Sequence, residues 1–191
     1  MKLNRLERWV VNSYLRRAWI VVNIRFFRRH GGIPQGASMI EIGCGEGLAL
    51  PLLRRRFLPR GLAAFDIDIG MLRRLLRREA APVAVADAAL LPLGPESCHA
   101  VFGFGVLHHV PHWQRALAEI SAVLRPGGVF CFEEFYPALY QNALTRRLLD
   151  HPDHNRFHSR SFKREFAEVG LSILRQIEIR PFYIIGIAVK R

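Results

Sequence analysis

The stretch that most constrains this chain is Ser38-Met-Ile-Glu-Ile-Gly-Cys-Gly-Glu-Gly47, where a short apolar run gives way to three glycines at alternate positions. The apolar half suits a buried strand. Gly43, Gly45 and Gly47 permit a sharp turn and let a ligand approach bare backbone. A helix is expected over residues 47–57, with its N-terminal amides facing the same crevice. The stretch therefore predicts a strand–turn–helix unit with a nucleotide-like ligand at the turn.

The residues around these glycines favour a cationic ligand over a dinucleotide. A dinucleotide site normally reads G-x-G-x-x-G, and here Leu48 stands where the third glycine would be needed. Glu41 and Glu46 flank the loop, where they would repel a pyrophosphate and attract a cation. A nicotinamide-dependent oxidoreductase is thus the disfavoured alternative.

Two more short apolar segments end in an acid. Asp66 follows Gly43 by 23 residues, close to the roughly 20 expected when an acid at the next strand end binds ribose hydroxyls. Asp68 is expected to cap the following helix. Asp87 ends the next strand, where it either contacts the same ligand or caps a short turn.

Two later segments complete the alternating pattern of strands and helices. Cys98-His-Ala-Val-Phe-Gly-Phe-Gly-Val-Leu-His-His-Val-Pro-His-Trp113 reads as a fourth strand and the loop beyond it. Arg125-Pro-Gly-Gly128 ends a helix before a fifth strand over residues 129–136. Residues 137–160 are expected to be irregular, and residues 171–179 and 182–189 to form a closing antiparallel hairpin.

These motifs, in this order, resemble class I S-adenosylmethionine-dependent methyltransferases of the small, single-domain, type 11-like kind. The resemblance covers about residues 33–189 and rests on the glycine loop, the strand-end acids, Val106-Leu-His-His109 and Leu124-Arg-Pro-Gly-Gly128. The chain departs from it at His99 and His112, where aspartate is usual. The resemblance implies an α/β, three-layer sandwich with a Rossmann-like, seven-stranded, mostly parallel sheet that ends in an antiparallel hairpin.

The resemblance also implies S-adenosylmethionine as cofactor, S-adenosylhomocysteine as product, and in-line methyl transfer to a small-molecule acceptor. The implied cofactor-binding residues are Glu41, Gly43, Cys44, Gly45, Gly47, Asp66, Ile67, Asp87, Ala88 and Gly103. A base is needed only if the nucleophile arrives protonated, and the candidates are His108, His109, Glu133 and Tyr136. A structural role stays open for each of these four residues.

Residues 1–30 read as a basic amphipathic helix or two, with apolar residues at helical spacing and arginines between them. We separate residues 1–32, as a lid or membrane-contact segment, from a cofactor-binding domain over 33–191. The helix either docks on the domain, attaches to a membrane surface, or belongs to an arginine-rich transit peptide. In the second case the acceptor would be a lipid or quinone. A third hypothesis is a cofactor-binding module without catalysis.

Net charge, cysteine content and histidine spacing indicate which partners and which compartment to expect. The formal net charge of +12 favours anionic partners, but the arginines form no single tract with interleaved aromatics, so nucleic acid is not expected. Three widely spaced cysteines in apolar surroundings, with no transmembrane or signal segment, favour a cytoplasmic protein. No metal is expected, although the histidines at 108, 109 and 112, or His151, His154 and His158 with Asp153, have ligand-like spacing.

Overall fold

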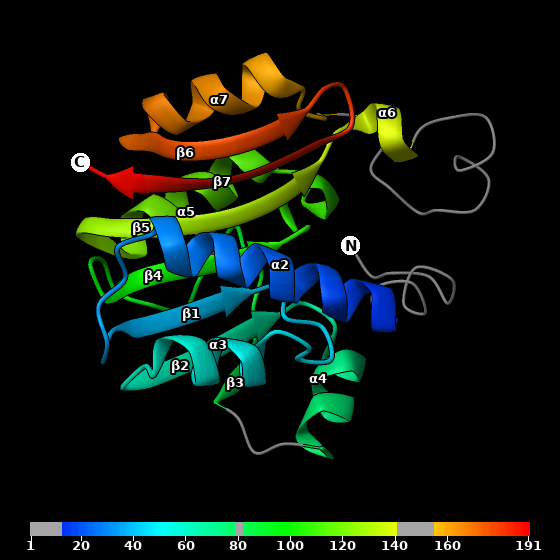
Figure 1. Ribbon diagram of the computed structural model, residues 1–191, viewed down its shortest axis with the longest axis vertical. Coiled ribbons are helices and arrows are strands. Elements are labelled where there is room, and N and C mark those ends of the chain that lie inside the picture. The colour runs from blue at the N-terminus through cyan, green and yellow to red at the C-terminus, as the bar shows by residue number, and fades with distance from the viewer. Residues whose placement is uncertain (1–12, 79–81, 141–154) are drawn as a thin grey trace.

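A seven-stranded sheet runs through the computed structural model, which describes residues 13–78, 82–140 and 155–191 (Figure 1). The strand order is β3-β2-β1-β4-β5-β7-β6. β1 to β5 are mutually parallel, and β7 runs antiparallel to β5 and to β6. The strands are β1 Ser38–Ile42, β2 Gly61–Asp66, β3 Val83–Val85, β4 Cys98–Phe104, β5 Leu124–Phe135, β6 Leu171–Ile179 and β7 Tyr183–Lys190. This confirms the predicted α/β fold and its C-terminal antiparallel hairpin.

Helices cover both faces of the sheet and complete three layers (Figure 1). The helices are α2 Tyr14–His30, α3 Leu50–Phe57, α4 Ile69–Leu76, the 3-10 turn η1 Leu107–His109, α5 Trp113–Val123, α6 Pro137–Tyr140 and α7 Ser159–Glu168. α2, α3 and α4 pack into the core on one face, and α5 and α7 into the core on the other.

Strand alternation decides which face each side chain meets. In β1, Met39 joins the α2–α3 side of the core, whereas Ile40 and Ile42 join the α5–α7 side. In β5, Cys131 lies on the α2 side and Phe132 on the α5 side. The same alternation separates the two glutamates that end β5.

The glycine loop forms the predicted turn, but its helix starts later than expected. Gly43, Gly45 and Gly47 all have positive φ, between 55° and 78°, so α3 begins only at Leu50. A Cβ atom at Gly43 would lie 2.5 Å from Val106 Cγ2. Close packing as well as backbone conformation therefore requires glycine there.

Several other predicted boundaries move by a few residues. Asp68 caps α4 as expected, its Oδ1 accepting the backbone N–H of Gly70 at 2.8 Å. Residues 137–160 were expected to be irregular, but they contain α6 and the start of α7, while residues 141–154 lie outside the described residues. The first part of the N-terminal segment, residues 1–12, also lies outside them.

Candidate active site

A cavity of about 270 Å³ opens at the carboxyl ends of β1, β2 and β4. This is the edge at which open parallel sheets bind ligands. Eight of the ten predicted cofactor-binding residues line it: Glu41, Gly43, Cys44, Gly45, Asp66, Ile67, Asp87 and Ala88. The other two, Gly47 and Gly103, lie behind the wall, against Leu75 and Phe130 respectively.

Three carboxylates from adjacent strands converge on this cavity. Asp66 ends β2 and accepts backbone N–H groups from Gly45 at 2.7 Å and from Asp68 at 2.8 Å. Asp87 follows β3 and also caps a short turn by accepting the N–H of Ala89 at 2.9 Å. Its two predicted roles, cavity wall and turn cap, are therefore compatible.

Glu41 is the third carboxylate and the most strongly perturbed. It is buried, and its Oε2 atom has no hydrogen-bond partner among the described residues. Burial, reinforced by the charge of Asp66 and partly offset by Arg16, raises the pKa of Glu41 well above its ordinary value. Such a group gains from a cation or hydrogen-bond donor entering the cavity.

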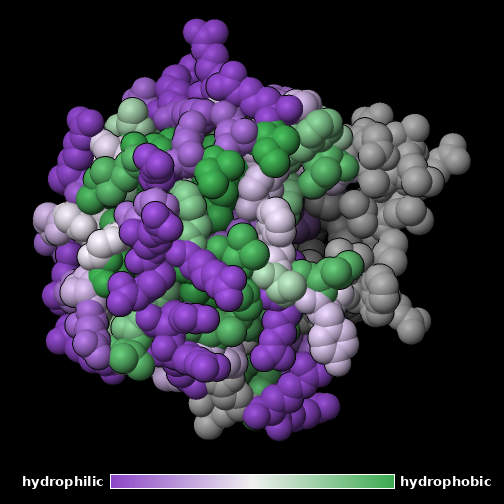
Figure 2. Space-filling model, in the orientation of Figure 1, coloured by the Kyte–Doolittle hydropathy of each residue, from purple (hydrophilic) through white to green (hydrophobic). Residues whose placement is uncertain are grey.

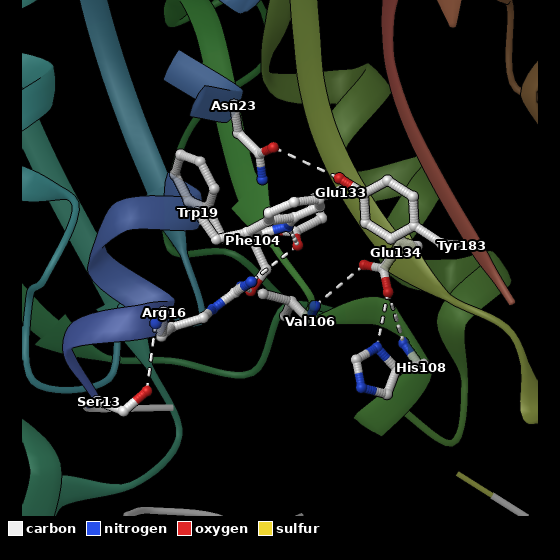
Figure 3. Close-up of polar contacts among 10 residues, drawn as sticks. All are labelled: Ser13, Arg16, Trp19, Asn23, Phe104, Val106, His108, Glu133, Glu134 and Tyr183. Atoms are coloured by element: carbon white, nitrogen blue, oxygen red, sulfur yellow. Dashed lines mark hydrogen bonds and ion pairs between the residues drawn. The ribbon is translucent and has the colours of Figure 1, made fainter. Parts of the chain in front are cut away.

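An arginine from α2 forms part of the cavity wall, which the sequence analysis did not anticipate. Arg16 Nη1 lies 2.7 Å from Glu133 Oε1, and Arg16 Nη2 donates to the Phe104 carbonyl at 2.9 Å (Figure 3). Trp19 Nε1 donates to the same Glu133 oxygen at 2.7 Å. These contacts attach the first turns of α2 to the ends of β4 and β5. Glu133, a predicted base, therefore lies behind the cavity wall and holds α2 in place.

His108 and His109 also line the cavity. Glu134, fully buried, accepts the backbone N–H groups of Val106 at 3.0 Å and Leu107 at 2.7 Å through Oε1 (Figure 3). Its Oε2 lies 2.7 Å from His108 Nδ1. Glu134 therefore fixes both the loop after β4 and the His108 ring.

Tyr136 does not reach the cavity. Strand alternation turns it to the α5–α7 side, where its hydroxyl donates to Glu178 Oε1 at 2.7 Å. The two departures from the family pattern also lie outside the cavity wall. His99 accepts the Ser38 N–H at the amino end of β4, and His112 precedes α5.

Among the described residues, no group of three or more His, Cys, Asp or Glu side chains is arranged to hold a metal ion. His151, Asp153 and His154, whose spacing is ligand-like, lie outside the described residues. His158 precedes α7 as its N-cap.

Comparison with known proteins points to one family. Residues 40–132 match the family described as "Methyltransferase domain". The chain is 34% identical over 154 residues to the malonyl-(acyl-carrier protein) O-methyltransferase of Methylococcus capsulatus, covering 77% of this chain and 56% of that protein. It is 31% identical over 105 residues to the phthiotriol/phenolphthiotriol dimycocerosates methyltransferase of Mycobacterium tuberculosis, covering 53% of this chain and 39% of that protein.

Solved structures share the fold. A SAM-dependent methyltransferase from Aquifex aeolicus superimposes with a TM-score of 0.76 at 13% identity, over the full length of both chains. This chain spans only about two fifths to little more than half the length of the two curated relatives it matches. The match identifies residues 40–132 as a methyltransferase domain, in a chain that has the fold of S-adenosylmethionine-dependent methyltransferases.

Proposed function

We propose that this protein transfers a methyl group from S-adenosylmethionine to a small-molecule acceptor and releases S-adenosylhomocysteine. The observation that supports this most is the convergence of Glu41, Asp66 and Asp87 on one cavity beside a glycine loop. A buried carboxylate with an unsatisfied oxygen fits a ligand that carries ammonium and sulfonium charges. When bound, this cofactor supplies an electrophilic methyl group.

Different residues of the cavity wall would contact different parts of the cofactor. We assign Asp66 to the ribose hydroxyls, Asp87 and Ala88 to the adenine, and Glu41 to the methionine end. The loop residues Gly43, Cys44 and Gly45 supply backbone for close approach. Residues 33–191 would then be the cofactor-binding domain and residues 1–32 the cap, whose Arg16 already forms part of the wall. Holding nucleophile and methyl in line contributes several kcal/mol, up to ~7–11 in ideal cases.

Calorimetry with S-adenosylmethionine tests the cofactor assignment. Glu41→Gln and Asp66→Asn each remove an ionisable carboxyl group at nearly constant shape. Each should weaken binding at least about tenfold, because a charge-assisted hydrogen bond contributes about 1.5–3 kcal/mol. Glu168→Gln, on the exposed end of α7, is the matched control.

Failure of the intact protein to bind, or equal losses in all three variants, would refute the cofactor assignment. Binding without turnover across hydroxyl, amine, thiol and carboxylate acceptors would instead favour a module without catalysis.

A second candidate function is methylation of a lipid or quinone at a membrane surface. The names of the two relatives describe acceptors with acyl chains. Within α2 there is no acidic residue, and Tyr14 and Leu15 are 91% and 84% exposed beside the cavity-lining Arg16. Hydrophobic and hydrophilic side chains both reach the surface along this face of the molecule (Figure 2). Such a helix suits an anionic lipid interface.

Vesicle flotation tests this candidate. The protein should float with anionic vesicles at low salt and less with neutral ones. Leu15→Glu should abolish flotation, while Leu174→Glu, at an exposed position of β6, should not. Equal behaviour of the two variants would exclude docking through α2.

We also propose that the protein works in the cytoplasm. No helix within residues 13–78, 82–140 and 155–191 combines the length and apolar character needed to cross a bilayer. Cys44, Cys98 and Cys131 are buried free thiols, which is typical of a reducing compartment such as the cytoplasm.

A further inference from the structure

Two adjacent glutamates, Glu133 and Glu134, lie near the carboxyl end of β5, and the cofactor site uses neither. Strand alternation sends Glu133 toward α2 and Glu134 toward η1. Glu134 is fully buried, yet it lies directly behind a wall of the cavity because it bonds to His108, which lines that cavity. A buried carboxylate in contact with a cavity-lining histidine calls for a chemical explanation.

The donors around Glu134 dictate the position of the proton on His108. Its Oε1 accepts two backbone N–H groups, and its Oε2 lies 3.4 Å from the backbone nitrogen of His108. Backbone N–H groups can only donate, so they favour the ionised carboxylate, which can only accept. The 2.7 Å contact between Oε2 and His108 Nδ1 therefore has Nδ1–H as its donor. In the neutral ring the lone pair then belongs to Nε2.

The ring is also held by packing. Phe135 meets it edge-on at a centroid distance of 5.5 Å, and the His109 ring lies 4.1 Å away. Tyr140 packs on it at 5.5 Å. Figure 3 shows the other end of the imidazole directed away from Glu134. The orientation of the ring is thus fixed before any ligand binds, and the donors around Glu134 favour the tautomer protonated on Nδ1.

We propose that Glu134 is a positioning residue that holds His108 with its Nε2 lone pair toward the acceptor, where His108 acts as general base for a hydroxyl acceptor. This rests on the proposed methyltransferase function and names its substrate class. As the acceptor oxygen bonds to the methyl carbon, its O–H proton passes to Nε2. The carbon–sulfur bond breaks and its electron pair remains on sulfur. The imidazolium is stabilised by Glu134 and later loses its proton to water.

Two observations favour a hydroxyl over a carboxylate acceptor. A carboxylate is already deprotonated at neutral pH and gains nothing from a base. The cavity wall also carries the carboxyl groups of Asp66 and Asp87, which disfavour an anionic acceptor.

Titration of Glu134 gives the inference a pH signature. Burial raises the pKa of Glu134 to about 7, against the backbone N–H groups and the positive charge of Arg16, which lower it. Among the described residues, the ionisable groups that face it are His108 of η1, Arg16 of α2 and Tyr140 of α6. Below about pH 7 the pair gains a proton and the Nε2 lone pair is lost, so the rate should fall on the acid side.

Nitrogen-15 NMR of the imidazole tests the role of Glu134 without any acceptor. The parent protein should show neutral His108 protonated on Nδ1. In Glu134→Gln the side-chain carbonyl can keep the backbone donors while the amide N–H donates to Nδ1, which forces the proton to Nε2. A parent ring protonated on Nε2, or a tautomer unchanged by Glu134→Gln, would overturn the proposal.

Single-turnover rates test the base. With matched alcohol or phenol and carboxylic acid acceptors, methylation should occur on the hydroxyl. It should slow by about 10²–10⁴-fold in Glu134→Gln and in His108→Gln, with KM nearly unchanged. Glu168→Gln should keep the parent rate. Turnover confined to carboxylates, or hydroxyl methylation unaffected by either substitution, would refute it.

Calorimetry with S-adenosylmethionine on the same samples distinguishes failure of the proposed function from failure of the proposed role of Glu134. If the parent protein does not bind the cofactor, the methyltransferase function is refuted. Intact cofactor binding with the wrong tautomer refutes only the role of Glu134. His108→Gln, which leaves Glu134 with its backbone donors, keeps the kinetic test available if Glu134→Gln fails to fold.

Discussion

Arg16→Ala is expected to destabilise the protein far more than loss of a solvent-exposed arginine from the same helix. Arg16 and Glu133 side chains are 13% and 0% exposed and lie 2.7 Å apart. Without Arg16, the carboxylate keeps Trp19 Nε1 as donor, and its Oε2 has no partner among the described residues. Removing one partner of a buried ion pair costs about 3–5 kcal/mol. For a chain of this size, that lowers Tm by about 6–20 °C.

Chemical and thermal denaturation measure this effect against Arg17→Ala, the exposed neighbour on α2. Arg17→Ala should change the free energy of unfolding by about 0.5 kcal/mol or less. Adding Glu133→Gln to the Arg16→Ala background should recover much of the loss, because it removes the unpaired charge. Equal losses for Arg16→Ala and Arg17→Ala, or no recovery in the double variant, would refute this reasoning.

Three further predictions concern buried ionisable groups. Because burial raises the pKa of Glu41, the folded state holds its proton more tightly than the unfolded state, and stability falls as pH rises through that raised pKa. The Tm advantage of Glu41→Gln over the parent, without cofactor, should therefore grow from pH 5 to pH 9 in thermal scans. Burial raises the pKa of Cys98 to about 12 and also raises the pKa values of Cys44 and Cys131. An aromatic disulfide reagent should react with these thiols slowly in the native protein and with all three in urea, and S-adenosylmethionine should further protect Cys44, which lines the cavity. Burial would raise the pKa of Glu178, but hydrogen bonds from its lysine, serine, tyrosine and arginine neighbours outweigh it and lower the pKa to about 2. The stability it contributes is present above its unfolded pKa and lost as pH falls toward 2, so Glu178→Gln should be destabilising at pH 7 and nearly neutral at pH 2 in urea titrations.

The features that could be predicted from the sequence follow local rules. The glycine loop could be predicted because its positive φ angles, and the close contact of Gly43 with Val106, require glycine. Asp66 and Asp87 could be placed at the cavity because Asp66 ends β2 and Asp87 closely follows β3, and parallel neighbouring strands end at one edge. The C-terminal hairpin followed from two apolar runs joined by a turn at Arg180-Pro181.

The features that escaped prediction depend on distant contacts or on a shift of one residue. Arg16 reads as one of several arginines on a basic helix, and its partners lie 117 and 88 residues away. Glu133 and Glu134 look interchangeable in the sequence, yet strand alternation sends them to opposite faces and gives them different partners. Tyr136 shares the face of Glu134, but it packs beyond the strand end against Glu178 instead of in the cavity.

These contacts also explain why the family match says more about the cofactor than about the acceptor. The matched segment, residues 40–132, contains the glycine loop and all three strand-end acids. The groups that fasten the remaining wall begin immediately after it, at Glu133 and Glu134, or come from α2 far before it. Since Arg16 and Phe135 line the cavity from outside the matched segment, we expect them to take part in selecting the acceptor. Substitutions at these two positions should therefore alter the choice of acceptor more than the affinity for S-adenosylmethionine.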